Sequence, residues 1–387
     1  MKRTNVLAVV LIFSSLGFAQ LKVNSSTKEY INNSLWSQVF NDFEVNMVFP
    51  VVTPWLFGFG SVNYIDNDVF TKNLIKENNQ FSTKNMVFRE VVNSLKVSFL
   101  NYLPIDSIMR IKAMYKNRVL YTFDISQNDT STVTDFNVPS KSVSESISFD
   151  KNGNLRYYTK SNFNGNTSIE NTFLKPDVAV CTIKNSESSE IIYDKRYYNE
   201  KKLKRKILTK KLEDGSKEVF VSDENFNYLD NMKLRSSINY NKKGNVIDSV
   251  VYLYDNDTLK MVLKLGKNGL SQKIVYTYPN VFNVIKKIEQ NDQKYEICVT
   301  TKNQKTSRIT FNEIVYGDFK AFDFEYNKNN QLITVSNFNT LTDIEQQNAP
   351  KKQFMFYYNE SNNIKSIKVV DSNGIIGKEI NFEYEFL

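Results

Sequence analysis

Carboxylates stand two residues apart in two short polar stretches, Asp66-Asn67-Asp68 and Asp255-Asn256-Asp257. Oxygen ligands held close together in a turn are the kind that Ca²⁺ prefers. Neither stretch continues into the glycine and the distal glutamate of an EF-hand loop. We therefore expect solvated turn residues at both places and no bound metal.

Paired carboxylates could also hydrolyse a glycosidic bond without histidine. The 42 Asp and Glu residues are spread along the chain, however, and no pair stands out by its position. Histidine is absent, which excludes Ser-His-Asp and Cys-His catalysis, His-ligated zinc and imidazole-based pH switching. We predict a protein that is not an enzyme, has no catalytic residues and uses no cofactor. A histidine-free glycoside hydrolase is kept as an alternative.

Three aromatic residues alternate in the most apolar part of the chain outside its beginning, residues 48–60. They are Trp55, Phe57 and Phe59. If they are exposed, they form a contact surface for a glycan, a lipid or a protein partner. If they are buried, they belong to the core of their region. We take these three residues as the candidate binding site.

Positive charge is concentrated in one stretch, Lys201–Lys211, in a chain with a formal net charge of +8. Such a cluster could bind a polyanion. Leu203 and Ile207 lie among the charges, and Glu213 and Asp214 follow at once. This pattern favours a solvated strand edge guarded by lysines, and we expect no nucleic-acid partner.

The first 20 residues have the pattern of a secretory signal peptide. Lys2 and Arg3 precede an apolar run over residues 6–13, and small residues lead to a cleavage site near Ala19 or Gln20. No later stretch is apolar for long enough to form a transmembrane helix. We expect export to the periplasm, the cell surface or the medium. There, Cys181 and Cys298 could form one disulfide, and buried free thiols are the alternative.

Residues 21–140 are predicted to form a separate N-terminal region that is mixed or mostly β. Apolar residues four apart, from Ile31 to Phe43, predict a short helix over residues 30–43. Alternating apolar residues on both sides of Lys116-Asn117 predict a β-hairpin over residues 110–126. The Ser-, Thr-, Asn- and Asp-rich stretch 124–146 is expected to be a connection.

A short phrase returns through residues 141–387. An aromatic is followed by Asp or Asn, by polar residues, by Gly or Asn and then by an aliphatic. Such a phrase predicts a strand, a tight turn and a second strand. The Asp or Asn can bond the turn backbone two residues on, and Gly or Asn tolerates positive φ. The full-length copies span Phe149 to Leu155, Tyr240 to Val246, Tyr326 to Leu332 and Tyr358 to Ile364.

In these phrases the chain resembles the YD repeats of the RHS class, and also hairpin repeats in secreted proteins of Bacteroidetes-like bacteria. The resemblance implies strands that wind round a cavity, and in some members a toxin domain follows the repeats. Here Ile380, Phe382, Tyr384 and Phe386 alternate up to the last residue, so a toxin role receives no support. Because the copies are few, we expect an open, twisted, mainly β sheet of irregular antiparallel hairpins.

Together these observations predict an exported, non-catalytic envelope or surface protein. Its expected role is structural or binding, with a protein or glycan partner. The alternating aromatic C-terminal strand also suggests an outer-membrane β-barrel. Against that alternative stand the scarcity of glycine, with 12 residues, and the density of lysine.

Overall fold

The structure is a computed structural model, and it describes residues 20–42 and 91–387 apart from short gaps. The gaps are residues 92–93, 96, 105, 154, 163–164, 176, 186–189, 200–201, 213–217, 291–292 and 313–319. Residues 1–19 of the expected signal peptide (1–20) and residues 43–90 lie outside the described part. Within it, no helix is long and apolar enough to cross a membrane.

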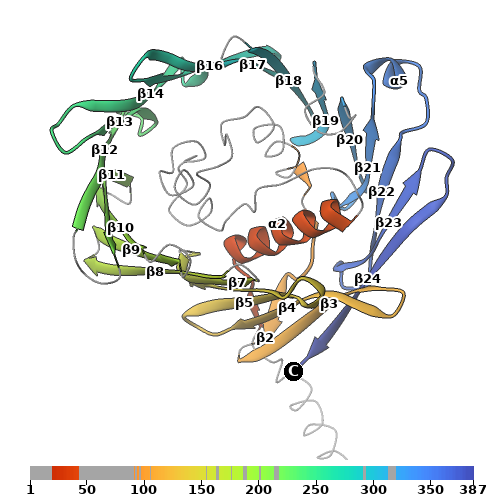
Figure 1. Cartoon of the computed structure of the whole chain (residues 1–387). Helices are drawn as coiled ribbons and strands as arrows, with labels where there is room; N and C mark the ends of the chain where they lie inside the picture. Colours follow the sequence, from red (N-terminus) through yellow and green to blue (C-terminus); the bar gives the residue numbers. More distant parts are fainter. Residues whose placement is uncertain are drawn as a thin grey trace, which may run out of the picture.

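One large antiparallel sheet dominates the chain (Figure 1), which confirms the predicted mainly β fold. Each strand from β3 to β24 pairs with the next one along the chain. Its strands are β3 (Ser107–Tyr115), β4 (Arg118–Gln127), β5 (Ser131–Val138), β6 (Val143–Asp150), β7 (Leu155–Asn162), β8 (Gly165–Lys175), β9 (Val178–Asn185), β10 (Glu190–Asn199), β11 (Lys202–Leu212), β12 (Glu218–Tyr228), β13 (Leu234–Tyr240), β14 (Val246–Asp255), β15 (Thr258–Gly266), β16 (Gly269–Asn280), β17 (Asn283–Gln290), β18 (Gln293–Lys302), β19 (Lys305–Phe311), β20 (Ala321–Tyr326), β21 (Leu332–Phe338), β22 (Lys352–Tyr358), β23 (Ile364–Asp371) and β24 (Ile376–Phe386).

The sheet closes on itself, where the sequence predicts an open sheet. β24 pairs with β3 from Asn381↔Met114 to Phe386↔Met109, which makes a closed barrel. The ring contains more hairpins than the repeated phrase indicates, because turns of other composition, such as Asn303-Gln304, add strands of their own. The boundary expected at residue 140 does not divide this sheet, since β5 pairs with β6 across it.

The predicted hairpin over residues 110–126 is confirmed as β3 and β4, whose turn residues Lys116 and Asn117 have φ of 47° and 62°. The stretch 124–146 is not a connection, because it contains the end of β4, all of β5 and the start of β6. The strand β5 was missed because polar threonines occupy its buried face. Thr132 and Thr134 are 3% and 0% exposed.

The repeated phrases form the turns that their residues predict. In the copy at Tyr240, the Asn241 side chain accepts from the Lys243 amide at 2.9 Å, and Gly244 takes φ of 77°. The opening aromatic and the closing aliphatic are cross-strand partners in all four full copies. These pairs are Phe149↔Leu155, Tyr240↔Val246, Tyr326↔Leu332 and Tyr358↔Ile364.

Tyrosines join successive hairpins along one end of the ring, which we call the ladder rim. Each hydroxyl donates a hydrogen bond to a backbone carbonyl near the start of the preceding hairpin's second strand, and thereby satisfies a carbonyl at the strand end. This tyrosine ladder comprises Tyr228 to Leu203 (2.9 Å), Tyr254 to Leu234 (3.1 Å), Tyr278 to Leu259 (2.9 Å), Tyr326 to Thr306 (3.0 Å), Tyr358 to Leu332 (2.8 Å) and Tyr384 to Ile364 (2.6 Å).

Removing one ladder hydroxyl should weaken the ring measurably. We expect Tyr384→Phe to lower the free energy of unfolding by about 1 kcal/mol, because the buried Ile364 carbonyl loses its donor. Tyr357→Phe is the matched control, since Tyr357 is 40% exposed and its hydroxyl makes a weak contact with the Met355 sulfur at 3.9 Å. Urea unfolding measures both variants, and equal effects would contradict a structural role for the ladder.

Alkaline pH should lower the stability of the fold by ionising tyrosines of the ladder rim. Burial raises the pKa of Tyr326 to about 12, from an ordinary value of 10.0. Between these values the unfolded chain loses its tyrosine proton while the folded chain keeps it. The stabilisation is therefore complete below pH 10 and is lost as the pH rises towards about 12. Urea midpoints measured through this interval should fall, and the fall should be smaller for Tyr326→Phe.

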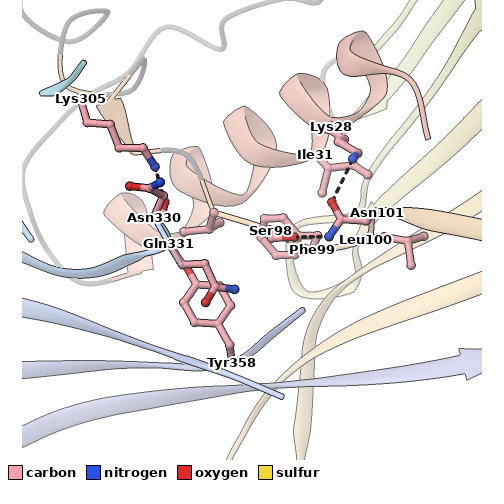
Figure 2. Close-up of a pocket in the computed structure, with 11 residues that line it drawn as sticks. Lys28, Ile31, Ser98, Phe99, Leu100, Asn101, Lys305, Asn330, Gln331 and Tyr358 are labelled. Carbon is pink, nitrogen blue, oxygen red and sulfur yellow. Dashed lines mark hydrogen bonds between the residues drawn. The ribbon is translucent and has the colours of Figure 1, made fainter. Parts of the chain in front are cut away.

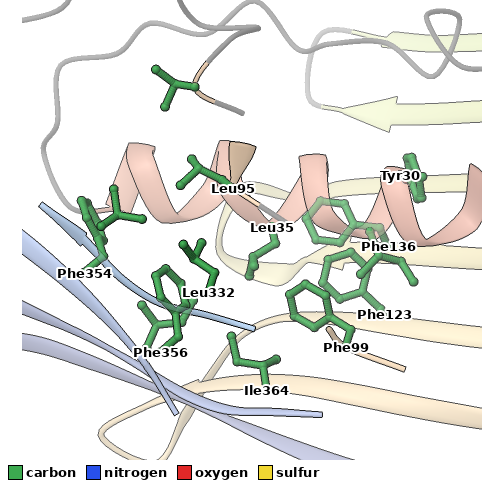
Figure 3. Close-up of a cluster of buried hydrophobic side chains, with 14 of the residues drawn as sticks. Tyr30, Leu35, Leu95, Phe99, Phe123, Phe136, Leu332, Phe354, Phe356 and Ile364 are labelled. Atoms are coloured by element: carbon green, nitrogen blue, oxygen red, sulfur yellow. The ribbon is translucent and has the colours of Figure 1, made fainter. Parts of the chain in front are cut away.

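The helix α2 (Ser25–Asp42) lies inside the ring, against β3 to β5 (Figure 1). It confirms the predicted helix but begins earlier, where the Asn24 side chain accepts from the Thr27 amide at 2.8 Å as an N-cap does. Its residues Ile31 and Leu35 are buried. Figure 3 shows Leu35 amid side chains of the ring wall and the segment 91–104, including Phe99, Phe123, Phe136, Leu332 and Phe356.

Two described stretches lie inside the ring, residues 20–42 with α2 and residues 97–104, and we call them together the inner segment. Short elements hold these two parts together. β1 (Gln20–Lys22) pairs with β2 (Tyr102–Pro104) beside α2. The Ser98 carbonyl accepts from the Ile364 amide at 2.7 Å, which ties residues 97–101 to the start of β23. The inner segment is thus fixed to the ladder rim.

Outside the ring, the short helix α5 (Leu341–Glu345) follows β21, and a capping box between Thr340 and Asp343 stabilises its first turn.

Candidate functional site

A pocket of about 250 Å³ opens where the inner segment meets the ladder rim (Figure 2). α2 and residues 97–101 form one side, and the first residues of β19, the β20–β21 turn and the end of β22 form the other. We call it the rim pocket. Its lining residues are Lys28, Ile31, Val97, Ser98, Phe99, Leu100, Asn101, Lys305, Asn330, Gln331 and Tyr358.

The apolar lining of the rim pocket comes mainly from the inner segment. Ile31, Phe99 and Leu100 are 1%, 4% and 5% exposed, so they are held rigidly by the core behind them. Tyr358 adds its ring from the opposite side, and its hydroxyl is engaged with the Leu332 carbonyl. The pocket therefore has a preformed apolar wall that faces an aromatic ring.

Lys28 brings positive charge from the first turn of α2. Its Nζ donates to the Asn101 side-chain oxygen at 3.0 Å, and the Asn101 amide donates to Ser98 Oγ at 3.1 Å. Partial burial, and after it the charge of Lys22, lowers the pKa of Lys28 from 10.5. An anion beside this ammonium would favour its charged form and so oppose the lowering of the pKa.

Lys305 brings a second positive charge from the opposite side. Its Nζ donates to the Asn330 carbonyl and lies 4.7 Å from the centre of the Tyr326 ring. Burial lowers the pKa of Lys305 from 10.5. Beside it, the Gln331 side chain is oriented by the Asn327 amide, which donates to its oxygen at 2.8 Å. Two lysines and three carboxamides, those of Asn101, Asn330 and Gln331, thus surround the opening.

The rim pocket combines positive charge, amides and an apolar wall. None of its described lining residues is a carboxylate, a cysteine or a histidine. Both lysine Nζ atoms contact neutral oxygens within the described residues. Ammonium groups, amides and an apolar wall can hold a ligand in one orientation.

A second concavity, which we call the outer trough, measures about 570 Å³. Hydroxyl, amide and carboxylate side chains of β4 to β8 line it, and Glu145 and Lys160 are also among its lining residues. Asp124 and Asp135 are cross-strand partners in it, and Asp135 in turn faces Ser146. Arg110 forms a two-pronged ion pair with Asp124, at 2.7 and 2.6 Å.

Two buried carboxylates inside the ring are engaged in ion pairs. Glu145 accepts from Lys160 Nζ at 2.7 Å and from the Tyr30 hydroxyl of α2 at 3.2 Å. Asp194, which is 0% exposed, accepts from Arg196 at 2.7 Å and lies 3.6 Å from Lys206. These contacts join neighbouring strands to each other and to α2, and they give both buried carboxylates, Glu145 and Asp194, a positively charged partner.

The basic stretch is not a strand edge, because β11 is paired on both sides, with β10 and with β12. Strand alternation divides its charges between the two faces of the sheet. Lys206 is 5% exposed and points inward to Asp194. Arg205 points outward and pairs with Asp223 at 2.6 Å. The stretch therefore presents no continuous basic surface.

The predicted contact residues Trp55, Phe57 and Phe59 lie outside the described residues, as does Asp66-Asn67-Asp68. In Asp255-Asn256-Asp257, the residues Asn256 and Asp257 form a two-residue turn, and Asp257 pairs with Lys233 at 3.3 Å. Within the described part, no cluster of three acidic or cysteine side chains could hold a metal. Cys298 is a free thiol, and β10 to β17 separate its strand from that of Cys181.

Sequence reasoning did not find the rim pocket. Its lysines and carboxamides come from four separate places along the chain, which only the folded ring brings together. One signal was present: a lysine stands just after the turn of several hairpins, as Lys202, Lys260 and Lys305 do. Each of these lies over a tyrosine ring of the next hairpin along the ladder rim.

No protein-family model matches this chain, and no curated protein matches it. Among solved structures, it is similar to a porin-like protein from Bacteroides uniformis, with 13% identity over 73% of this chain and 98% of that one, at a TM-score of 0.27. It is similar to the Tc holotoxin pore of Photorhabdus luminescens, with 10% identity over 70% of this chain, at a TM-score of 0.20. The match covers 16% of that toxin chain. Likenesses this distant assign neither a family nor a function.

Proposed function

We propose that this chain is an exported, non-catalytic envelope or surface protein that binds a glycan. The rim pocket carries this proposal, because it combines a rigid apolar wall, an aromatic ring and several amide groups in one concavity. Amides pair with sugar hydroxyls, and rings pack on the apolar faces of sugars. A few convergent polar groups on an apolar wall are typical of a ligand site. A protein partner is the competing occupant.

The outer face of the ring supports a protein that faces water. Cross-strand ion pairs recur on strands around the ring, among them Lys273–Glu289 at 3.5 Å, Arg308–Asp323 at 2.6 Å and Lys368–Glu379 at 3.5 Å. Charged side chains at the middle of a lipid-facing wall cost several kcal/mol each. These pairs weigh against the alternative in which the strands face lipid.

The resemblance to YD repeats remains part of the proposal. It is supported by the hairpin phrases, whose turns have the backbone bonds and the positive φ that their residues predict. Export by a signal peptide over residues 1–20 and a bacterial envelope location rest on the sequence pattern alone. Trp55, Phe57 and Phe59 remain a predicted second contact surface.

A glycan array tests the proposal. The chain from residue 21 to residue 387 is applied alongside Trp55→Ala and Lys305→Gln. We expect saturable binding to a subset of glycans that Lys305→Gln weakens. Loss in Trp55→Ala alone would move the site to the aromatic segment. Absence of binding to every glycan would overturn the proposal and favour a protein partner, to be sought by pull-down from envelope extract.

Among the described residues, the hydrolase alternative could act in the outer trough, which Asp124, Asp135 and Glu145 line. Asp124 and Asp135 are cross-strand partners on one wall, Arg110 holds Asp124, and Glu145 is bonded to Lys160 and Tyr30. A glycosidase needs its two carboxyl groups on either side of the scissile bond. We therefore expect bound glycans to be recovered uncleaved. Release of reducing ends by the chain, abolished in Asp135→Asn, would establish the alternative.

A further inference from the structure

The rim pocket carries a specific charge pattern that the proposed function does not yet use. Lys28 and Lys305 approach it from opposite sides, one from the helix inside the ring and one from the rim. Within the described residues both Nζ atoms hydrogen-bond only to neutral oxygens, those of Asn101 and Asn330. Many other lysines of the ring are paired with carboxylates, as Lys160, Lys273 and Lys368 are. Among the described residues, the pocket therefore presents two positive charges that are not paired with a carboxylate.

The size of the pocket limits what can neutralise these charges. Its volume of about 250 Å³ is below the roughly 300–1,000 Å³ of sites for drug-sized ligands. It admits one ring-sized unit and not a length of polymer. Such a unit would enter as the end of a chain or as a free small molecule.

The remaining lining distinguishes between small anions. Ile31, Phe99 and Tyr358 offer apolar and aromatic surface, which a bare inorganic anion would leave without a partner. The amides of Asn101, Asn330 and Gln331 can both donate and accept, as ring hydroxyls require. A neutral sugar would use these groups but would leave both ammonium groups uncompensated in a partly desolvated place.

We propose that the rim pocket binds a single carboxylate-bearing sugar, attracted by the positive charges of Lys28 and Lys305, with its hydroxyls on the carboxamides and one ring face on the apolar wall. This inference rests on the proposed glycan-binding function and names the sugar class. It concerns binding only, and no bond is made or broken.

Isothermal titration of the chain from residue 21 to residue 387 tests the inference with three probes: glucuronate, glucose and inorganic phosphate. Glucose has the same ring without the carboxylate, and phosphate has the charge without the ring. We expect saturable binding of glucuronate, and binding at least about tenfold weaker for each of the other two, equivalent to about 1.4 kcal/mol. Binding of glucuronate should weaken as salt is added.

Variants assign the site. Lys28→Gln and Lys305→Gln should each weaken glucuronate binding at least about tenfold, and thermal unfolding checks that both variants fold. Lys202→Gln is the matched control. Lys202 stands at the corresponding place of β11, donates to the Met232 carbonyl and lies 5.1 Å from the centre of the Tyr228 ring, but it is not among the residues that line the pocket. Asn330→Asp adds a negative charge beside Lys305, keeps a side chain that tolerates positive φ, and should abolish binding.

The outcomes separate this inference from the function on which it rests. Glycan binding on the array that shows no preference for acidic sugars, or that survives both lysine variants, would overturn the sugar class and leave the function standing. Equal affinity for glucuronate and phosphate would show a general anion site and would also overturn it. If no glycan binds at all, both fail together.

Discussion

Replacing Glu145 with alanine is expected to lower the free energy of unfolding by about 3–5 kcal/mol, the cost of breaking a buried ion pair from one side. Glu145 is 7% exposed, and its two oxygens accept from Lys160 and from the Tyr30 hydroxyl. Its loss leaves the Lys160 ammonium, 16% exposed, without its counter-ion. Because Tyr30 belongs to α2, the same change removes a bond that holds the helix to the wall.

Glu289→Ala provides the matched control. Glu289 also pairs with a lysine of the neighbouring strand, Lys273, at 3.5 Å, but its side chain is 46% exposed. Exposed pairs contribute less than about 1 kcal/mol, so this variant should unfold close to the wild type in urea. If Glu145→Ala were as mild as Glu289→Ala, the helix would not be anchored through this carboxylate.

Gly153→Ala is expected to destabilise the fold by about 2–3 kcal/mol, more than the same change at Gly244, because the Ser26 hydroxyl must also rotate away and give up its hydrogen bond to Gly153. Both glycines occupy the same position of the repeated phrase, with φ of 80° and 77°, so both alanines pay about 1–2 kcal/mol for a left-handed conformation. An added Cβ at Gly153 would also lie 2.8 Å from Ser26 Oγ, whereas nothing lies within 4 Å at Gly244. The extra cost measures the contact with the start of α2.

Ser26 also donates to the Gly153 carbonyl at 2.8 Å, so the contact can be tested from both sides. In a double-mutant cycle with Ser26→Ala, the extra penalty at position 153 should shrink, since the crowded oxygen is gone. Equal urea midpoints for Gly153→Ala and Gly244→Ala would show that α2 does not begin against this turn.

The sequence predicts the hairpin turns of this fold because their chemistry is local. An Asn or Asp that bonds two residues on, as Asn241 bonds Lys243, acts within a few residues of itself. The helix followed from Ile31 and Leu35 for the same reason, since their spacing repeats within one element. Each of these features is decided by neighbours along the chain.

Closure of the ring depends on residues far apart in sequence and was therefore not predicted. The seam between β24 and β3 is formed by pairs such as Glu385 with Lys112, 273 residues apart. The sequence of neither strand indicates that the other is its partner. The buried Thr134 of β5 and the inward-facing Lys206 of β11 are further examples, because polar side chains also face the inside of this ring and alternation of polarity no longer marks its inner face.

The rim pocket could not be predicted from the sequence, because its residues are far apart along the chain and are of ordinary types. Lys28 comes from a helix, Asn101 from the segment that follows residues outside the described part, and Lys305 and Asn330 from two hairpins. Their meeting needs the closed ring and the helix inside it. The aromatic segment with Trp55 was the conspicuous candidate because its composition is unusual, whereas the pocket uses residue types that are common throughout the chain.

The most direct test of the central claim, binding without turnover, is a calorimetric titration of the full chain from residue 21 with the glycan that binds best on the array, followed by mass analysis of the recovered glycan. Our account predicts saturable binding at a defined stoichiometry, reduced in Lys305→Gln, and a glycan recovered intact. Absence of saturable heat, or recovery of a shortened glycan, would contradict it.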